Sequence, residues 1–313
     1  MKAAAGKRRA ASARTARFET GAGVLTPLLV NPVEGRSGST LMMTLLDHPQ
    51  VAFDRVHPYE HRYLAYLTHL LTPVGEAYQA SELWDNDLML EGDPTRFGPI
   101  PFPTLLVDRQ DLRIRLVRHA WAALSESVEG FAGRPSRYYA EKTWGTGLQL
   151  FKEAGIRAKV VNLVRDPRDI VASIRALDAR RGFHGFGRTA DMSDESYLEF
   201  VLAAMGAQLL SMRRLELDGA HDCVLIRYED IVSDPTAVTR RLSGFLDLDL
   251  ATDRAVLSGP GFDRHATSPS ASQSIGRWRT QLSETDVATI LARLGDEMHR
   301  YGYLDGSSGP QEP

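Results

Sequence analysis

The sequence predicts an α/β fold with a central, mostly parallel β-sheet flanked by helices on both faces. Short apolar runs bounded by turn residues alternate with longer segments whose apolar residues recur at helical spacing. The apolar runs at 28–30 and 158–164 each end in a short polar turn that opens directly into a helical segment. Strands that alternate with helices in this way usually pair in parallel, because each helix returns the chain to the starting edge of the sheet.

The pattern predicts strands at 28–30, 51–53, 137–140, 158–164 and 223–226. Helices are expected at 40–46, 58–71, 112–128, 148–154, 167–177, from 193 onward, 235–246 and 283–301, with irregular segments at 75–107, 178–192 and 259–274. Pro58 suits a first helical position. Glu60 would then lie at the top of a buried face that carries Tyr63, Tyr66 and Leu67.

Length and composition favour a single domain. A chain of 313 residues with 43% apolar and 25% charged residues can bury a large core, and we expect one domain over 23–305. The basic residues of 1–22 are accompanied by no long apolar run, which favours a disordered tail over a secretory signal or an organelle-targeting peptide. Residues 306–313 are expected to be a second disordered tail.

Charge and cysteine content exclude several classes of protein. The net charge of −3 offers no global basic field for nucleic acid, and no run of about 18 apolar residues suits a membrane span. The single cysteine, Cys223, permits no internal disulfide and is expected to be a buried thiol. We therefore expect a cytoplasmic protein with neither a nucleic-acid nor a membrane partner.

The turn after the first strand has the composition of an anion-binding loop, although an ordinary turn between a strand and a helix is the alternative. Its glycines allow close approach, its hydroxyl groups and backbone N–H groups are donors, and its arginine adds a fixed positive charge. The residues are Gly35, Arg36, Ser37, Gly38, Ser39 and Thr40. The turn has no lysine, so it is not the phosphate-binding loop (Walker A motif) of a nucleoside triphosphatase.

This loop resembles the 5′-phosphosulfate-binding loop of the sulfotransferases, which use 3′-phosphoadenosine 5′-phosphosulfate (PAPS). Residues 162–173 resemble the 3′-phosphate-binding segment of the same family, in which Arg165 and Ser173 match the two phosphate-binding positions. An ion pair between Arg165 and Asp169 is the alternative. The resemblance implies a P-loop-NTPase-like sulfotransferase fold, PAPS as donor, 3′,5′-diphosphoadenosine (PAP) as product, and no metal.

The resemblance also implies three catalytic residues. Arg36 and Lys142, the latter in a segment like the lysine-bearing strand of the family, would contact the transferring group. The cytosolic branch places a histidine base two residues after that lysine, where this chain has Trp144, so the base must lie elsewhere. Glu60, in a context like that of bacterial and protein-modifying relatives, is the first candidate. The other candidates are Glu141, His57 and His61.

Two C-terminal segments complete the implied donor site. Tyr228 matches the tyrosine beside the adenine, and Arg277 lies in a segment like the loop that closes over the donor. The Arg-Lys-Gly triplet of the cytosolic branch is absent, since Ala271, Ser272 and Gln273 stand there. Arg277 would substitute for it, and a solvated arginine is the alternative. Leu41 replaces a tryptophan of the same branch, so the residue that stacks on adenine is unassigned.

The expected function is sulfuryl transfer from PAPS to a hydroxyl group, with a small molecule as the favoured acceptor. Carbohydrates and protein tyrosine stay open as acceptors, and the sequence predicts no oligomeric state. Some aromatic residues suit an acceptor pocket, with the core or the surface as the alternative: Tyr59, Tyr63, Trp84, Phe183, His184 and Phe186. The alternatives are a non-catalytic nucleotide-binding protein, an ATP-dependent phosphotransferase, and a zinc hydrolase using His57, Glu60 and His61.

Overall fold

The protein forms a five-stranded parallel sheet. The computed structural model describes residues 24–56, 58–60, 62–64, 66–68, 108–132, 136–143, 145–251, 267–268 and 270–304. The strands are β1 (Thr26–Pro32), β2 (Val51–Ala52), β3 (Tyr138–Lys142), β4 (Lys159–Val164) and β5 (Asp222–Arg227), in the order β2-β3-β1-β4-β5. All four strand pairs are parallel. The predicted α/β fold is confirmed.

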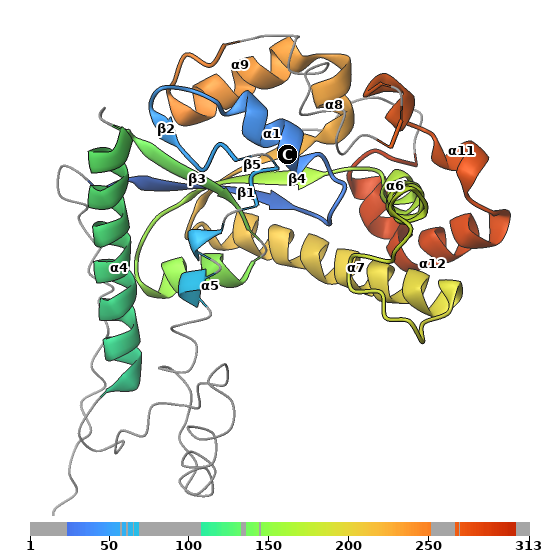
Figure 1. Cartoon of the computed structure of the whole chain (residues 1–313), viewed down its shortest axis with the longest axis horizontal. Coiled ribbons are helices and arrows are strands. Elements are labelled where there is room, and N and C mark those ends of the chain that lie inside the picture. The colour runs from blue at the N-terminus through green and yellow to red at the C-terminus, as the bar shows by residue number, and fades with distance from the viewer. Residues whose placement is uncertain are drawn as a thin grey trace, which may run out of the picture.

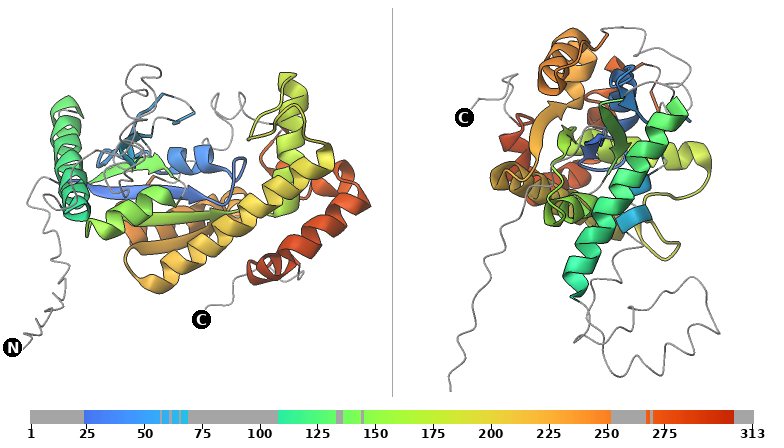
Figure 2. Two further views of the ribbon diagram at one scale, coloured as in Figure 1. Left: turned by 90° about the horizontal axis from the view of Figure 1, so that it is seen from below. Right: turned by 90° about the vertical axis from the view of Figure 1, so that its left-hand side faces the viewer.

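Helices cover both faces of this sheet (Figures 1 and 2). In Figure 1, α1 (Ser39–Leu45), α8 (Tyr228–Ser233) and α9 (Pro235–Leu246) lie above it. Below it lie α5 (Thr146–Glu153) and α7 (Asp194–Asp218). The remaining helices are α4 (Arg109–Ala132), α6 (Pro167–Arg181), the short 3₁₀ helix η2 (Ser272–Ser274), α11 (Trp278–Gln281) and α12 (Glu284–Arg300).

The core divides according to the alternation of side chains along the strands. Leu28 and Val30 belong to the cluster that includes α1, α8 and α9 side chains, whereas Leu29 belongs to the cluster that includes α4 and α5 side chains. Because successive residues of a strand point to opposite faces, β1 supplies both clusters from three consecutive apolar residues. A strand buried on both sides explains why this run shows no polar alternation in the sequence.

Helix α6 begins as predicted but ends later. Asp166 caps it by accepting from the backbone N–H of Arg168, and Pro167 occupies the first turn. The helix continues to Arg181 and stops at Gly182, which has a left-handed backbone. The first turn of the expected 178–192 loop is therefore helical.

The predicted helix from Pro58 is wrong at its start. Tyr59 has a φ of 63°, which ends any regular helix there, and among the described residues of this segment 63–64 and 66–68 are helical. Glu60 therefore precedes the helix instead of lying on its buried face, and Tyr66 is 62% exposed. Cys223 is only partly buried, contrary to expectation.

The two expected tails fall outside the described residues, and the domain boundaries stay predictions. Within the described ranges, no helix is both long and apolar enough to cross a membrane.

Candidate functional site

The predicted site residues meet at one edge of the sheet. The loop with Arg36 follows β1, Lys142 is the last residue of β3, Arg165 follows β4, and Tyr228 follows β5. Since all these strands are parallel, their carboxyl ends lie at the same edge, beside α1 and α6 in Figure 1. Ligands of open α/β sheets bind outside this edge.

The turn after β1 requires glycine at position 38. Gly38 has a φ of 93°, and a Cβ atom there would lie 2.4 Å from Cδ2 of Tyr228. Arg36 also has a left-handed backbone, with a φ of 71°. The Ser37 hydroxyl is fully buried and donates to the carbonyl of Glu34 at 2.7 Å. The loop is thus a fixed turn in close contact with Tyr228.

Arg165 joins this loop to the C-terminal part of the chain. Its Nη1 donates to the Arg36 carbonyl at 2.8 Å, and its Nη2 donates to the Ser274 carbonyl at 2.7 Å. Its guanidinium lies 4.3 Å from the ring centroid of Tyr228, whose hydroxyl is 2.7 Å from Ser274 Oγ. One buried arginine therefore holds three segments of the site in contact.

The alternative partner of Arg165 has a different role. Asp169 accepts from the backbone N–H groups of Gly276, at 2.6 Å, and Trp278, at 3.0 Å. No hydrogen bond or ion pair joins Arg165 to Asp169 among the described contacts. Asp169 instead fixes the segment before α11 against α6.

Arg36 extends toward the predicted 3′-phosphate residue. Its Nε donates to Ser173 Oγ at 3.1 Å, Ser173 Oγ lies 3.1 Å from Thr267 Oγ1, and Arg277 Nη1 donates to Thr267 at 2.6 Å. Burial and the positive charge of Arg165 lower the pKa of Arg36 to about 10 and also lower the pKa of Arg277. We call Arg36, Arg165, Ser173, Thr267 and Arg277 the arginine cluster.

Lys142 occupies the other end of the loop. Its side chain is 1% exposed, and its Nζ donates to Thr40 Oγ1 at 3.0 Å, to the Pro58 carbonyl at 2.6 Å and to Glu60 Oε1 at 2.7 Å. Burial lowers the pKa of Lys142 even though Glu60 opposes the shift. Thr40 thus links the Lys142–Glu60 pair to the same loop that carries Arg36.

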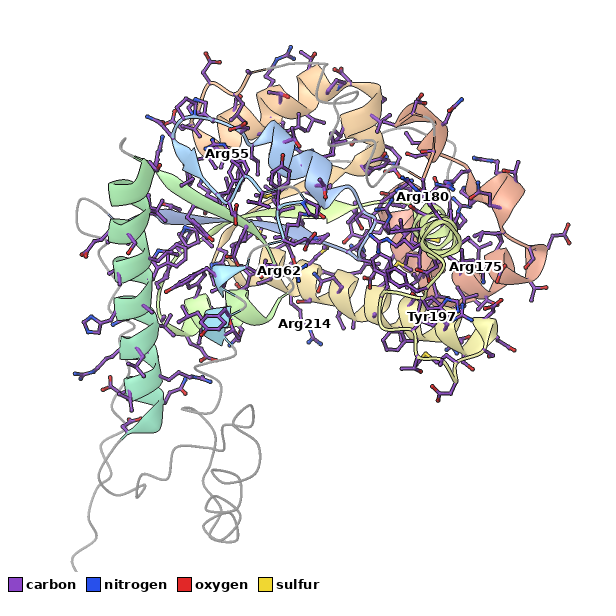
Figure 3. The ribbon with its side chains drawn as sticks, viewed as in Figure 1. Arg55, Arg62, Arg175, Arg180, Tyr197 and Arg214 are labelled. Carbon is purple, nitrogen blue, oxygen red and sulfur yellow. The ribbon has the colours of Figure 1, made fainter. Side chains whose placement is uncertain are left out.

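Glu60 is a partly exposed carboxylate, with 44% of its side chain accessible. Burial raises its pKa, but the hydrogen bonds from Lys142 and from Arg62 (labelled in Figure 3) outweigh that effect and lower the pKa below the usual value. A carboxylate held in this way is ionised at neutral pH and can accept a proton.

Glu141 faces away from this pair. It adjoins Lys142 in β3, so its side chain points to the opposite face of the sheet. Its carboxylate is buried and accepts from the backbone N–H of Leu64 at 3.0 and 3.1 Å. Burial raises its pKa to about 7. The geometry gives Glu141 an anchoring role for the segment that follows Glu60. The other candidate bases, His57 and His61, lie outside the described residues.

The hydrogen-bond donors of the site suit a ligand that carries negative charge at two places. The arginine cluster and Lys142 lie at opposite ends of the 36–40 loop, and both ends present N–H and O–H donors. Arg165 Nε is buried without a hydrogen-bond partner, a donor that an oxyanion would satisfy. His57 and His61 of the zinc alternative lie outside the described residues. Within the part of the chain that the structure describes, no three His, Cys, Asp or Glu side chains lie together so that they could hold a metal ion.

Two residues of the site, Thr267 and Ser274, were not predicted, and one of the suggested aromatic residues also contacts the loop. Thr267 and Ser274 join separate segments through their hydroxyl groups, and Phe186 contacts the loop where a Cβ on Gly35 would lie 2.5 Å from its ring. The sequence signals only that 259–274 is rich in serine. Phe183, suggested for an acceptor pocket, is 60% exposed, and Trp84 and Trp144 lie outside the described residues.

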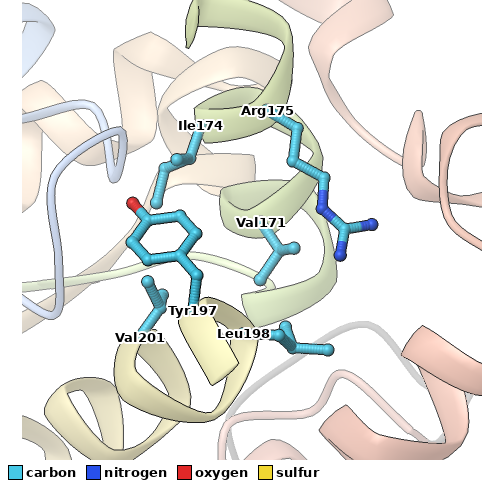
Figure 4. A pocket seen from close by; sticks show the side chains of 6 residues that line it. All are labelled: Val171, Ile174, Arg175, Tyr197, Leu198 and Val201. Atoms are coloured by element: carbon cyan, nitrogen blue, oxygen red, sulfur yellow. The ribbon is translucent and has the colours of Figure 1, made fainter. Parts of the chain in front are cut away.

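A hollow between α6 and α7 is a separate feature (Figure 4). Its cavity volume is about 10 Å³, and its lining residues are Val171, Ile174, Arg175, Tyr197, Leu198 and Val201. Arg175, the one charged residue of this lining, is already paired with Asp286 at 2.7 Å. The hollow is smaller than the roughly 300–1,000 Å³ of typical ligand pockets, so it does not suit an acceptor.

Comparison with known proteins identifies the family. A model described as the sulfotransferase family matches residues 34–253, well over half of the chain. Human carbohydrate sulfotransferase 1 is 30% identical over 169 residues, which cover 47% of this chain and 40% of that protein. Mouse carbohydrate sulfotransferase 4 is 25% identical over 179 residues, 52% of this chain and 46% of that protein. This chain therefore matches less than half the length of either relative.

Two solved structures resemble this chain at low identity. The sulfotransferase domain from the curacin biosynthetic pathway is 16% identical, with a TM-score of 0.49 over 87% of this chain and 98% of that one. A mouse sulfotransferase in complex with PAP is 11% identical, with a TM-score of 0.47 over 88% of this chain and 85% of that one. These two likenesses are too distant to carry a functional argument. The extent of the family-model match is what decides the assignment: the chain belongs to the sulfotransferase family.

Proposed function

We propose that the protein transfers a sulfuryl group from PAPS to a hydroxyl group of an acceptor. The observation that carries the proposal is the placement of two cationic groups at the two ends of one loop. The arginine cluster lies at one end, and the buried Lys142 with its carboxylate partner Glu60 lies at the other. A donor with a 3′-phosphate and a 5′-phosphosulfate has its negative charge divided in the same way.

The proposed reaction assigns separate roles to Glu60 and Lys142. Glu60 takes the proton from the acceptor hydroxyl, and that oxygen bonds to sulfur while the bond from sulfur to the 5′-phosphate oxygen breaks. Lys142 releases Glu60 and donates to the leaving oxygen, where negative charge develops. Most of the acceleration then comes from positioning and charge, as in phosphoryl transfer. The positive charge comes from side chains, so the proposed reaction needs no metal.

We propose a sugar hydroxyl as the first acceptor to test, within the wider class of small hydroxylated molecules. The names of two relatives, carbohydrate sulfotransferases 1 and 4, support this choice. The partial exposure of Glu60 is consistent with an acceptor that arrives from solvent.

Transfer of labelled sulfate from PAPS to a panel of saccharides, phenols and alcohols tests the proposal. The Lys142→Ala variant should lose about two to three orders of magnitude in turnover, the usual cost of removing a donor aimed at developing charge. Its affinity for PAP, measured by calorimetry, should change little, because Lys142 serves the sulfuryl end.

Lys152→Ala is the matched control, since Lys152 is 42% exposed and paired with Asp218 away from the site. Near-normal turnover in Lys142→Ala would remove Lys142 from the reaction. Tight PAP binding by the wild-type protein without transfer to any acceptor would favour a nucleotide-binding protein, and preference for ATP over PAP would favour a phosphotransferase.

A further inference from the structure

We propose that Glu141 positions the catalytic base: by fixing the backbone of Leu64, it holds the segment that carries Glu60 in place while Lys142 contacts the leaving oxygen. This inference rests on the proposed function, because it concerns how the proposed base is held during the proposed reaction. Glu141 acts through Leu64 and Glu60, so it is a positioning residue and not a catalytic one.

The last two residues of β3 bind the same segment from opposite faces of the sheet. On one face, Lys142 Nζ donates to the Pro58 carbonyl at 2.6 Å and to Glu60 Oε1 at 2.7 Å. On the other face, the Glu141 carboxylate accepts from the backbone N–H of Leu64 at 3.0 and 3.1 Å. Both residues are in register with β1, so the two contacts start from a fixed part of the sheet.

The side chain of Leu64 is held as firmly as its backbone. It is fully buried and belongs to the same core cluster as Leu148 and Phe151 of α5. A Cβ atom on Gly147 of α5 would lie 2.6 Å from both Cγ and Cδ2 of Leu64, so the absence of a side chain at position 147 makes room for the leucine. We call Glu141, Leu64 and Gly147 the Leu64 anchor.

Glu60, in contrast, is exposed to solvent. Its side chain is 44% accessible, and its carboxylate accepts from Lys142 and Arg62. Glu60 lies four residues before Leu64, and four residues of chain span at most about 14 Å. A displacement of Leu64 therefore changes where the carboxylate of Glu60 can lie.

The Leu64 anchor matters most at the step in which Lys142 changes partner. Lys142 cannot hold Glu60 while it donates to the leaving oxygen, so the ion pair of the free protein is lost at that step. The contacts of Leu64 with Glu141 and Gly147 do not involve Lys142, so they remain. They keep Glu60 within reach of the acceptor hydroxyl, where a misplacement of about 1 Å can cost about 100-fold in rate.

The positioning role needs no proton transfer by Glu141. Burial raises the pKa of Glu141 to about 7, but the ionised and the protonated carboxyl group both keep an oxygen that accepts from a backbone N–H. Glutamine at this position also keeps such an oxygen, whereas alanine removes it. The two substitutions therefore distinguish a hydrogen-bond acceptor from a base.

Turnover and PAP affinity of two Glu141 variants test the inference. Glu141→Ala should lower kcat by about 10- to 100-fold and leave PAP affinity within about twofold, because the Leu64 anchor serves the base and not the donor. Glu141→Gln should recover most of the lost kcat. Gly295→Ala in α12, where nothing lies within 4 Å of an added Cβ, is the control and should change neither quantity. An equal loss of kcat in both Glu141 variants would show that Glu141 transfers a proton and would overturn the inference.

A double-mutant cycle determines whether Glu141 acts through Glu60. In the Glu60→Gln background, Glu141→Ala should lower the residual turnover by less than about threefold, because no base is left to position. Losses that multiply would show that Glu141 acts independently of Glu60 and would overturn the inference. If Glu141→Ala does not fold, Gly147→Ala takes its place in the cycle with the same expectation, since its added Cβ displaces Leu64 from the side of α5.

The outcomes also separate this inference from the proposed function. Failure of the wild-type protein to transfer sulfate from PAPS to any acceptor would overturn the proposed function. Normal transfer by the wild type, together with an unchanged kcat in Glu141→Ala, would overturn the positioning role alone.

Discussion

The Lys142–Glu60 pair is the residue-scale feature on which the proposed chemistry depends. A lysine that is 1% exposed needs compensation for its lost hydration, and three acceptors, Glu60, Thr40 and the Pro58 carbonyl, provide it. The same contact keeps Glu60 ionised. Each partner thus favours the charged form of the other. Lys142 is positively charged and can stabilise the leaving oxygen, and Glu60 is negatively charged and can accept the proton.

Replacement of Glu60 by glutamine should abolish most of the turnover. The amide keeps the size of the side chain but accepts no proton, and general-base catalysis is usually worth about two to four orders of magnitude. PAP affinity should be nearly unchanged, because Glu60 lies at the sulfuryl end. Turnover within tenfold of wild type would show that another group takes the proton.

The pH profile of the same reaction distinguishes Glu60 from Glu141. The pKa of Glu60 is lowered in the free protein, so the base is lost only as pH falls below the ordinary glutamate range, and the acid limb of kcat/KM should lie below about pH 4.5. Burial raises the pKa of Glu141 to about 7. An acid limb near pH 7 would therefore identify Glu141 as the base and contradict the assignment of Glu60.

At the scale of elements, the connection from β1 to α1 depends on Gly38. Alanine there would take a φ of 93° and place its Cβ 2.4 Å from the Tyr228 ring, which contacts Arg165 and Ser274. We expect Gly38→Ala to lower the free energy of unfolding by about 1–3 kcal/mol and to weaken PAP binding. Urea unfolding and calorimetry measure the two effects.

Gly244→Ala is the control for this substitution. Gly244 lies inside α9, and nothing stands within 4 Å of a Cβ built on it. Alanine in a helix interior is more favourable than glycine by about 0.5–1 kcal/mol, so this variant should be slightly more stable and bind PAP normally. A Gly38→Ala variant as stable as Gly244→Ala would contradict the strain argument.

The sequence predicts the elements better than the contacts between them. Apolar runs and turns correctly indicate the strands, and Asp166-Pro167 correctly marks the start of α6. The predicted start of the helix at Pro58 is wrong because Tyr59 adopts a left-handed backbone conformation, which no local sequence pattern indicates. Helix α8 was not predicted, since it follows β5 without any turn residue.

The predicted site residues converge for a reason that the sequence does contain: parallel strands bring their carboxyl ends to one edge. The direction of the Arg36 side chain and the role of Thr267 were beyond prediction, because both depend on contacts between residues 94 or more positions apart in the chain. The sequence pattern thus predicts where the site lies. Contacts between residues far apart in the chain determine which residue contacts which part of a ligand.

At the scale of the whole molecule, the C-terminal segment stabilises the turn between β4 and α6, which carries Arg165. The Tyr303 hydroxyl donates to Glu229 Oε2 at 3.1 Å, while Glu229 Oε1 accepts from the backbone N–H of Asp166 at 3.0 Å. Arg168 adds a bond to the Tyr303 carbonyl at 2.9 Å. The last described residues are therefore tied to the turn between β4 and α6, more than 130 positions earlier in the chain.

Tyr303→Phe should destabilise the protein without altering the donor site. The substitution removes the hydroxyl donated to Glu229 and should cost about 1–2 kcal/mol, since it withdraws a hydrogen bond from a partly buried carboxylate. The Arg168 bond to the backbone carbonyl remains, so PAP affinity should stay within about twofold. Tyr66→Phe is the matched control, because Tyr66 is 62% exposed and its loss should cost little. Equal unfolding midpoints in urea for both variants would show that the hydrogen bond from Tyr303 to Glu229 contributes nothing to stability.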